Sequence, residues 1–514
     1  MNKRLSSSTL IASSTSAAGS LMASITLLVI LATPVPLIAQ VQPHYKLIDI
    51  GTLGGPNSSV DFAGFPLNAL NGQGVLTGCA DTAIADPNYP NFNPYIPPGS
   101  YGLPQPDPLI FHAFQWINGT LTDLGALPGL NSSCATHISG SALIAGESEN
   151  GVLDPINGWP EVQAVLWRPG QIINLGTLGG YESFATGVNT QGQVVGLATI
   201  DTPDSFSFPG LGQQARAFLW ENGTMRDLGT LGGPDAYAIG INDRGQVLGF
   251  SFINSIPNPT TGLPTGNAFL WENGVITDIP DPLGGTMVTP FYLSDKGEVV
   301  GYASLPGDIP GQEHPFLWQN GVFTDLGTFG GTGGAAEKIN VAAQIVGNAN
   351  FAGGPAYHAA IWQNGSISDL GTVPSDDCSV GLDINSLGQT VGYSAACDGS
   401  TGRAFLWQNG GPMVDLNTLI PENSGLHLQI ATNINDLGEI VGSGMLANGD
   451  IHAFLLIPCA SDTDCQPAVG SKVPALTSSP LQQGVPDVQS VKRLLAQRYG
   501  RSWMARYRNL REQH

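Results

Sequence analysis

A sequence motif recurs along this chain, and one position of the motif carries a polar side chain that could take part in catalysis or metal binding. Four of the eight residues at this position are histidines. The set consists of His112, Gln163, Arg216, Asn267, His314, His358, Arg403 and His452. Imidazole groups bind zinc and act as general acids or bases, so the set raises the question of a metal site or a catalytic site.

A second set places an acid in almost every copy of the same motif. Its members are Asp49, Asp123, Asp227, Asp278, Asp325, Asp369 and Asp415, with Asn174 in the remaining copy. An acid that recurs with the repeat is expected to serve the scaffold. We expect each carboxylate to accept hydrogen bonds from backbone amides of the Leu-Gly-Thr turn that follows it.

Both sets belong to a repeat that runs along most of the chain. Its anchor residues are Trp116, Trp167, Trp220, Trp271, Trp318, Trp362 and Trp407, with Leu456 in the eighth place. Successive tryptophans are 44 to 53 residues apart, a period that indicates a repeat fold. Because blades of such a fold pack on both faces, we expect the tryptophans to be structural.

Each copy contains four short apolar runs, and short connections with Asn and Gly, such as Asn-Asp-Arg-Gly and Glu-Asn-Gly, join the first run to the second and the third to the fourth. In one copy the runs are 236–242, 246–252, 268–271 and 275–279. Asn and Gly in short connections favour β-hairpins, so each copy predicts four antiparallel strands, here called a to d. Eight copies predict an all-β, eight-bladed β-propeller. A seven-bladed ring is the alternative, because the copies near 128–160 and 280–294 are degenerate.

The two ends of the repeat region each hold part of one copy. Residues 45–55 supply only a d strand, and residues 452–458 supply a c strand with no d strand after it. We expect Tyr45–Leu53 to pair with His452–Ile457, which would close the ring and hide its sheet edges.

This geometry argues against a metal at the histidine set. Strand c is the third strand from the axis, so adjacent copies should lie more than about 10 Å apart. A zinc ion needs ligands at about 2 Å. The sequence therefore predicts no metal site, and these side chains are expected to cap neighbouring loops.

Binding is expected at the face that carries the b–c connections, because they are long and variable on a rigid scaffold. The longest, 83–111, is rich in proline. It is either an aromatic platform over the mouth of the ring or a stiffened insert that covers its blade. The candidate ligand-binding residues are Tyr89, Phe92, Tyr95, Tyr101, His112, Arg216, His314, His358, Arg403 and His452.

The motif resembles the HAF repeat, which is named for a His-Ala-Phe triplet. That triplet stands at 112–114 and 452–454, with variants at 216–218, 314–316 and 403–405, and the companion Asp-Leu-Gly-Thr-Leu-Gly-Gly is complete at 227–233. The resemblance covers about four fifths of the chain. It implies an extracellular bacterial propeller and brings no reaction and no catalytic residues.

Six cysteines favour disulfides rather than metal thiolates in an exported chain. Cys378 and Cys397 flank the a–b hairpin of one blade at nearly equal distances from its turn, so we expect them to be bonded. Cys459 and Cys465 bracket a tight loop, which leaves Cys79 and Cys134 on neighbouring blades. Since six cysteines allow fifteen pairings, the first pair has the strongest argument.

The chain divides into four segments. Residues 1–40 have a basic start and an apolar core at 21–32, typical of an export signal. Residues 41–458 are the propeller, 459–485 a linker with the small cysteine loop, and 486–514 a basic amphipathic helix. That helix would contact either an anionic surface or the acidic propeller itself.

Charge excludes one class of partner. Residues 41–470 contain 8 Lys and Arg against 38 Asp and Glu, whereas 471–514 contain 8 against 2. Because a ring with this excess of acidic residues repels phosphate backbones, we do not expect nucleic acid as a partner.

No nucleophile elbow, zinc-protease motif or phosphate loop is present, and no cofactor is predicted. We therefore expect a secreted, monomeric binding module for a glycan or a protein. The alternative is an extracellular polysaccharide hydrolase or lyase with acids near the central channel.

Overall fold

A computed structural model describes residues 44–60, 68–93, 107–204, 207, 210–309, 311–354, 356–408, 410–422, 424–459 and 465. The expected export signal (1–40), most of the 459–485 linker and the expected helix (486–514) lie outside these residues. The described chain holds a single 3₁₀ turn, Leu416–Thr418, and no helix that could span a bilayer.

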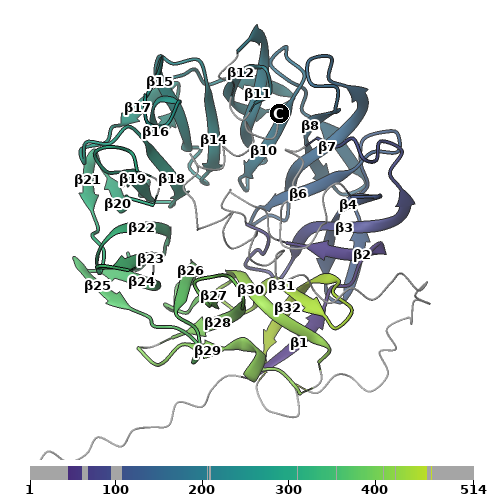
Figure 1. Cartoon of the computed structure of the whole chain (residues 1–514). Coiled ribbons are helices and arrows are strands. Elements are labelled where there is room, and N and C mark those ends of the chain that lie inside the picture. The colour runs from purple at the N-terminus through teal and green to yellow at the C-terminus, as the bar shows by residue number, and fades with distance from the viewer. Residues whose placement is uncertain are drawn as a thin grey trace, which may run out of the picture. The chain divides into compact units, whose positions relative to one another are not determined.

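The strands form eight four-stranded antiparallel sheets around a central axis, as predicted (Figure 1). Blades 1 and 2 consist of β2 (Gly54–Ser59), β3 (Leu76–Ala85), β4 (Leu109–Ile117) and β5 (Thr120–Asp123), then β6 (Ser133–Ile138), β7 (Ile144–Leu153), β8 (Pro160–Arg168) and β9 (Gln171–Asn174). Blades 3 and 4 consist of β10 (Ser183–Val188), β11 (Val194–Pro203), β12 (Gln213–Glu221) and β13 (Thr224–Asp227), then β14 (Ala236–Ile241), β15 (Val247–Pro257), β16 (Pro264–Glu272) and β17 (Val275–Ile279).

The remaining blades follow the same order. Blades 5 and 6 consist of β18 (Val288–Leu293), β19 (Val299–Ser304), β20 (Glu313–Gln319) and β21 (Val322–Asp325), then β22 (Gly330–Ile339), β23 (Ile345–Phe351), β24 (Tyr357–Gln363) and β25 (Ser366–Asp369). Blades 7 and 8 consist of β26 (Cys378–Ile384), β27 (Thr390–Ala395), β28 (Arg403–Trp407) and β29 (Val414–Asp415), then β30 (Leu426–Ile434), β31 (Ile440–Leu446), β32 (Ile451–Pro458) and β1 (Tyr45–Asp49). The degenerate copies form regular blades 2 and 5, so the seven-bladed alternative is wrong.

The side on which the a–b and c–d turns lie is called the turn side, and the opposite one the loop side. Each a–b turn is organised by one residue, most often asparagine. The Oδ1 atom of Asn242 accepts hydrogen bonds from the backbone amides of Arg244 and Gln246, and its Nδ2 donates to Ser294 O of the next blade at 3.0 Å. The recurring Asn therefore shapes its own turn and links adjacent blades.

The repeated apolar residues form the core between blades. The phenylalanines of strand c, such as Phe218 and Phe454, are fully buried, and Trp220 is 5% exposed. The glycine of strand b permits close contact with strand a: a Cβ atom on Gly196 would lie 1.9 Å from Phe184 O. Any larger residue there would push the two strands apart.

The N-terminal strand completes the last blade. β1 pairs with β32 from Tyr45 opposite Pro458 to Asp49 opposite Phe454, so purple β1 lies beside yellow-green β32 (Figure 1). His452 spans the junction, with Nδ1 2.7 Å from Asp49 Oδ1 and Nε2 3.2 Å from Pro56 O. Burial disfavours the charged imidazole, but these partners outweigh it and raise the pKa of His452.

The b–c connections differ from the sequence interpretation. The sequence predicts loops in stretches that are partly β-strand in the structure. Strands β3, β7, β11 and β15 continue into these stretches and form extended hairpins on the loop side. Alternating apolar runs end before these extensions, which is why the sequence did not reveal them.

Candidate functional site

The innermost strands carry a shared irregularity near the turn side. In β14 the register with β15 shifts between Ala238 and Gly240, and six of the other seven inner strands have a shift at the matching place. Such a β-bulge re-aims side chains. Here it brings successive residues of several inner strands, such as Phe291 and Tyr292, to the central channel.

These residues line a cavity of about 260 Å³ at the turn-side end of the channel. Its lining includes the residue just after the bulge in six of the seven bulged strands, and the residue type at this place varies around the ring. These residues are His137, Gly187, Gly240, Tyr292, Lys338 and Asn433, with Asn68 from blade 1. The volume is slightly below the usual range for drug-sized ligands, so the cavity suits a small molecule or the end of a chain.

An ion pair stands in the same ring of positions. Lys338 Nζ lies 2.6 Å from Asp383 Oδ1, whose side chain is only 2% exposed. The Asp383 carboxylate also accepts hydrogen bonds from the amides of Ile384 and Ile434. Both of its oxygens are thus engaged, so Asp383 is held in place and is not a free general base.

Lys338 keeps its charge in this setting. Burial opposes the ammonium form, but the Asp383 carboxylate, the Tyr292 hydroxyl and more distant Asp436 outweigh burial and raise the pKa of Lys338. The ammonium group also lies 5.4 Å from the centre of the Tyr292 ring. Such a cation–aromatic contact holds both groups at the cavity wall.

His137 is neutral at physiological pH. Burial lowers its pKa to about 4, and its Nδ1 atom is buried without a hydrogen-bond partner. A neutral imidazole offers one donor and one acceptor. An unpartnered buried ring nitrogen is costly, and this cost adds to the penalty of placing the imidazole at the cavity wall.

Two adjacent blades leave space at this ring. Gly187 and Gly240 have no side chain, and a Cβ atom on Gly240 would meet nothing within 4 Å. The cavity therefore offers an ammonium group, a phenol, an imidazole and amides around an open side, and its lining also includes the carboxylates of Asp243, Asp295 and Glu337. Because these carboxylates outnumber the one ammonium group, the wall disfavours anions, and its donors and acceptors suit an uncharged ligand with several hydroxyl groups.

The predicted histidine set lies elsewhere, between strands c and d of each blade. His112, His314 and His358 each place Nδ1 at 2.9–3.1 Å from the aspartate eleven residues later, Asp123, Asp325 and Asp369. Arg216 lies 3.6 Å from Asp227, and Arg403 lies 2.6 Å from Asp376. The structure therefore pairs each member within or next to its blade and does not bring the set together.

The predicted aspartate role is present as well. Asp227 Oδ1 accepts the amide of Gly229 at 2.7 Å, and the same turn recurs at Asp123, Asp325 and Asp369. The spacing of eleven between the two sets, which holds in six of the eight copies, was visible in the sequence. It could have indicated the pairing once strands c and d were known to form a hairpin.

The long connection of blade 1 rests on its neighbour. Asn91 Nδ2 donates to Gly158 O at 2.9 Å and Asn93 Nδ2 to Pro160 O at 3.0 Å. Tyr89 is 51% exposed, and Phe92 is half-buried. Tyr95 and Tyr101 lie outside the described residues, so an aromatic platform stays a prediction.

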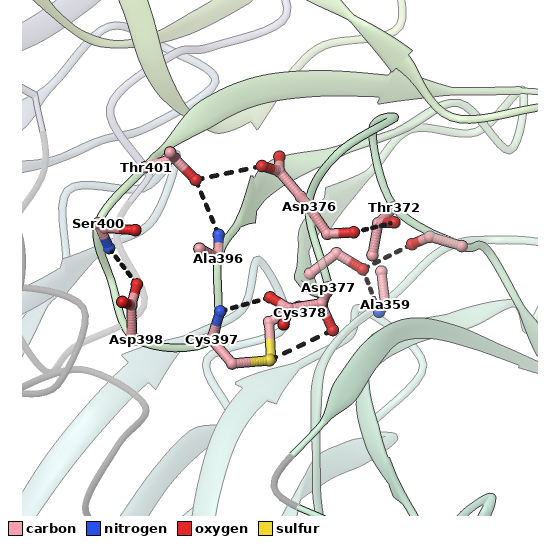
Figure 2. Close-up of a disulfide and its surroundings, with 12 residues drawn as sticks. Ala359, Thr372, Asp376, Asp377, Cys378, Ala396, Cys397, Asp398, Ser400 and Thr401 are labelled. Atoms are coloured by element: carbon pink, nitrogen blue, oxygen red, sulfur yellow. Dashed lines mark hydrogen bonds between the residues drawn. A yellow bond between two sulfur atoms is a disulfide. The ribbon is translucent and has the colours of Figure 1, made fainter.

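The three expected disulfides, Cys79–Cys134, Cys378–Cys397 and Cys459–Cys465, are present. Cys378 and Cys397 have Cα atoms 5.1 Å apart, and Asp377 accepts the amide of Cys397 at 2.6 Å (Figure 2). Asp377 and the two sulfur atoms lie close enough to hold a metal. Because the sulfur atoms are bonded to each other, they are not thiolate ligands.

Replacing both Cys378 and Cys397 by serine is expected to lower the free energy of unfolding by about 3 kcal/mol, from the entropy of a loop of this length. Urea unfolding of the variant and the parent would measure the loss. The control replaces Cys459 and Cys465, whose loop is shorter and whose loss should be smaller. An equal or larger loss in the control would contradict the loop-length argument.

Comparison with known proteins assigns no family to this chain. No protein-family model and no curated protein matches the chain. Solved structures that match include the β-propeller domain of the Trilobed protease from Pyrococcus furiosus (8% identity, TM-score 0.39, 63% of this chain and 93% of that one). A second is the acylaminoacyl peptidase of Pyrococcus horikoshii (10% identity, TM-score 0.36, 62% of this chain and 50% of that one). A third is a gluconolactonase from Xanthomonas campestris (11% identity, TM-score 0.28, 65% of this chain and 92% of that one). The match spans half the length of the peptidase, and these TM-scores carry no argument about function.

Proposed function

We propose that the protein is a secreted binding module that holds an uncharged, hydroxyl-rich ligand, such as the end of a glycan chain, in the channel cavity. The observation that carries this proposal is the set of polar residues His137, Tyr292, Lys338, Asn433 and Asn68 around an open volume, at a place where the residue type varies between blades although most other positions repeat. A scaffold needs the same residue in every blade, whereas a ligand with no eightfold symmetry needs different ones. The proposal places the ligand on the turn side, opposite the face that the sequence favoured.

The location outside the cell is part of the proposal. Three disulfides indicate an oxidising environment, extracellular or periplasmic. The resemblance to the HAF repeat agrees with this location. Both the export signal and the family assignment stay predictions.

A cavity-filling variant tests the proposal. Gly240→Leu adds a side chain where the backbone has room and where no left-handed conformation is required, so the fold should persist. We expect it to weaken glycan binding about tenfold or more, because the side chain occupies the ligand volume. A glycan array followed by calorimetry on the best ligand would measure the change.

The matched control is Gly72→Leu, an exposed glycine of the blade 1 turn that also has nothing within 4 Å and does not line the cavity. Its binding should equal that of the parent. Equal binding by both variants would reject the cavity as the site. Shortening of the polysaccharide during the measurement would favour the alternative, a hydrolase or lyase.

A further inference from the structure

The exposed charges of the propeller are sorted between its two sides. Among the described residues, the exposed carboxylates that lie in the d strands or in the b–c and d–a connections and hairpins are Asp49, Asp123, Asp201, Asp227, Asp278, Asp325, Asp369, Asp377, Asp398 and Glu422. The exposed basic residues of the same described set are Arg168, Arg226, Arg244 and Lys296, and three of them lie in or beside the c–d and a–b turns. Arg226 lies in the d strand β13, but its guanidinium group is 3.6 Å from Glu221 at the c–d turn, so its charge also belongs to the turn side.

The loop side therefore has no exposed lysine or arginine within the described chain. Its two arginines, Arg216 and Arg403, are half-buried and already paired with aspartates. On the turn side, exposed acids such as Asp243 and Asp295 are interspersed with the basic residues. The strong negative potential of the ring is thus concentrated on the loop side.

Buried acids beneath this surface add less charge than their number suggests. Burial raises the pKa of Asp81 to about 8, of Glu182 to about 8 and of Glu149 to about 7, with neighbouring carboxylates adding to the shift. Near neutral pH, Asp81 and Glu182 are therefore mostly protonated and Glu149 is about half protonated. The negative potential of the loop side therefore comes from its exposed carboxylates.

A segment of the same chain has the opposite charge. Residues 471–514 contain eight basic and two acidic residues and lie outside the described residues. They follow Cys465, which is bonded to Cys459 just after β32. The 49 residues after Cys465 could extend at most roughly 160 Å, and a ten-residue strand spans about 33 Å, so they can reach the loop side.

We propose that the basic segment 471–514 binds the acidic loop side of its own propeller. Covalent attachment makes the encounter intramolecular and so favours this occupant over a separate basic protein. Charge complementarity supplies the attraction, which salt should screen. The proposal concerns the side opposite the channel cavity and does not depend on the proposed ligand.

The test measures binding in trans. A fluorescent peptide of residues 471–514 is titrated against a chain ending at residue 470, which retains all eight blades. We expect binding at low salt, at least about tenfold weaker binding at 0.5 M salt, and weaker binding to the full-length chain, whose own segment competes. Absence of binding in trans would overturn the proposal.

Two matched charge variants locate the surface. The loop-side variant combines Asp201→Asn, Asp278→Asn, Asp398→Asn and Glu422→Gln, and the turn-side variant combines Asp243→Asn, Glu272→Gln, Asp295→Asn and Asp436→Asn. The loop-side variant should bind the peptide about tenfold more weakly, whereas the turn-side variant should bind it nearly as well as the parent does. Equal weakening of peptide binding by the two variants would overturn the assignment of the surface. The proposal would also be overturned if residues 471–514 were needed for binding to anionic vesicles and the peptide did not bind the propeller in trans.

Discussion

Replacing Lys338 by methionine is expected to lower the free energy of unfolding by about 4 kcal/mol, because the change leaves Asp383 buried without a counter-charge. Asp383 is 2% exposed and has no other cation within ion-pair distance among the described residues. Its remaining partners are amides, which stabilise a carboxylate less than an ammonium group does. Urea unfolding at pH 7 would measure the loss.

The control for this variant is the double replacement Lys338→Met with Asp383→Asn. Asparagine keeps an oxygen for the amide of Ile384 and removes the charge, so the double variant should recover more than half of the loss. A double variant as unstable as Lys338→Met alone would show that packing, and not the buried charge, is responsible.

The pair also predicts a pH dependence. The folded-state pKa of Lys338 is raised above its unfolded value, so its contribution to stability is fully present below pH 10.5. The contribution is lost as pH rises through the folded-state pKa. The parent should therefore lose more stability than Lys338→Met between neutral pH and strongly alkaline pH.

The scaffold could be predicted because repetition multiplies a weak signal. One hairpin of the type 236–252 is ambiguous, but eight copies in register identify the blades. The disulfide between Cys378 and Cys397 followed from the same hairpin symmetry. Strand extensions such as Val152–Leu153 were not predicted, because their exposed apolar residues do not recur at the same position of the other copies.

The cavity could not be predicted because it consists of the positions that break the repeat. His137, Tyr292 and Lys338 occupy equivalent places only after the bulge in each inner strand is known. The sequence offered one signal. The position of strand a that follows the bulge differs in residue type between the copies, whereas the positions next to it are mostly small or apolar. Which of these residues meet, such as Lys338 and Asp383, depends on the order of blades around the axis.

Deleting residues 44–53 is expected to destabilise the ring even more than Lys338→Met does. The deletion removes β1, exposes the edge of β32, and takes away the buried side chains of Tyr45 and Ile50, which are 1% and 5% exposed. Burial of two such side chains and their neighbours stabilises by about 5 kcal/mol, which is comparable with the total stability of many domains. Circular dichroism melting should therefore show a much lower midpoint or no cooperative transition.

A rearranged chain separates strand pairing from loss of the N-terminal residues as such. His44 O accepts the amide of Cys459 at 2.9 Å, so the start of β1 lies beside the end of β32. Moving residues 44–53 to follow Pro458 through an Asn-Gly turn, in a chain that begins at residue 54, would give blade 8 the c–d hairpin that the other seven blades have. This rearrangement should restore the melting midpoint to near that of the parent, because the same strand again covers β32. A rearranged chain that melts like the deletion variant would show that β1 stabilises the ring through something other than its pairing with β32.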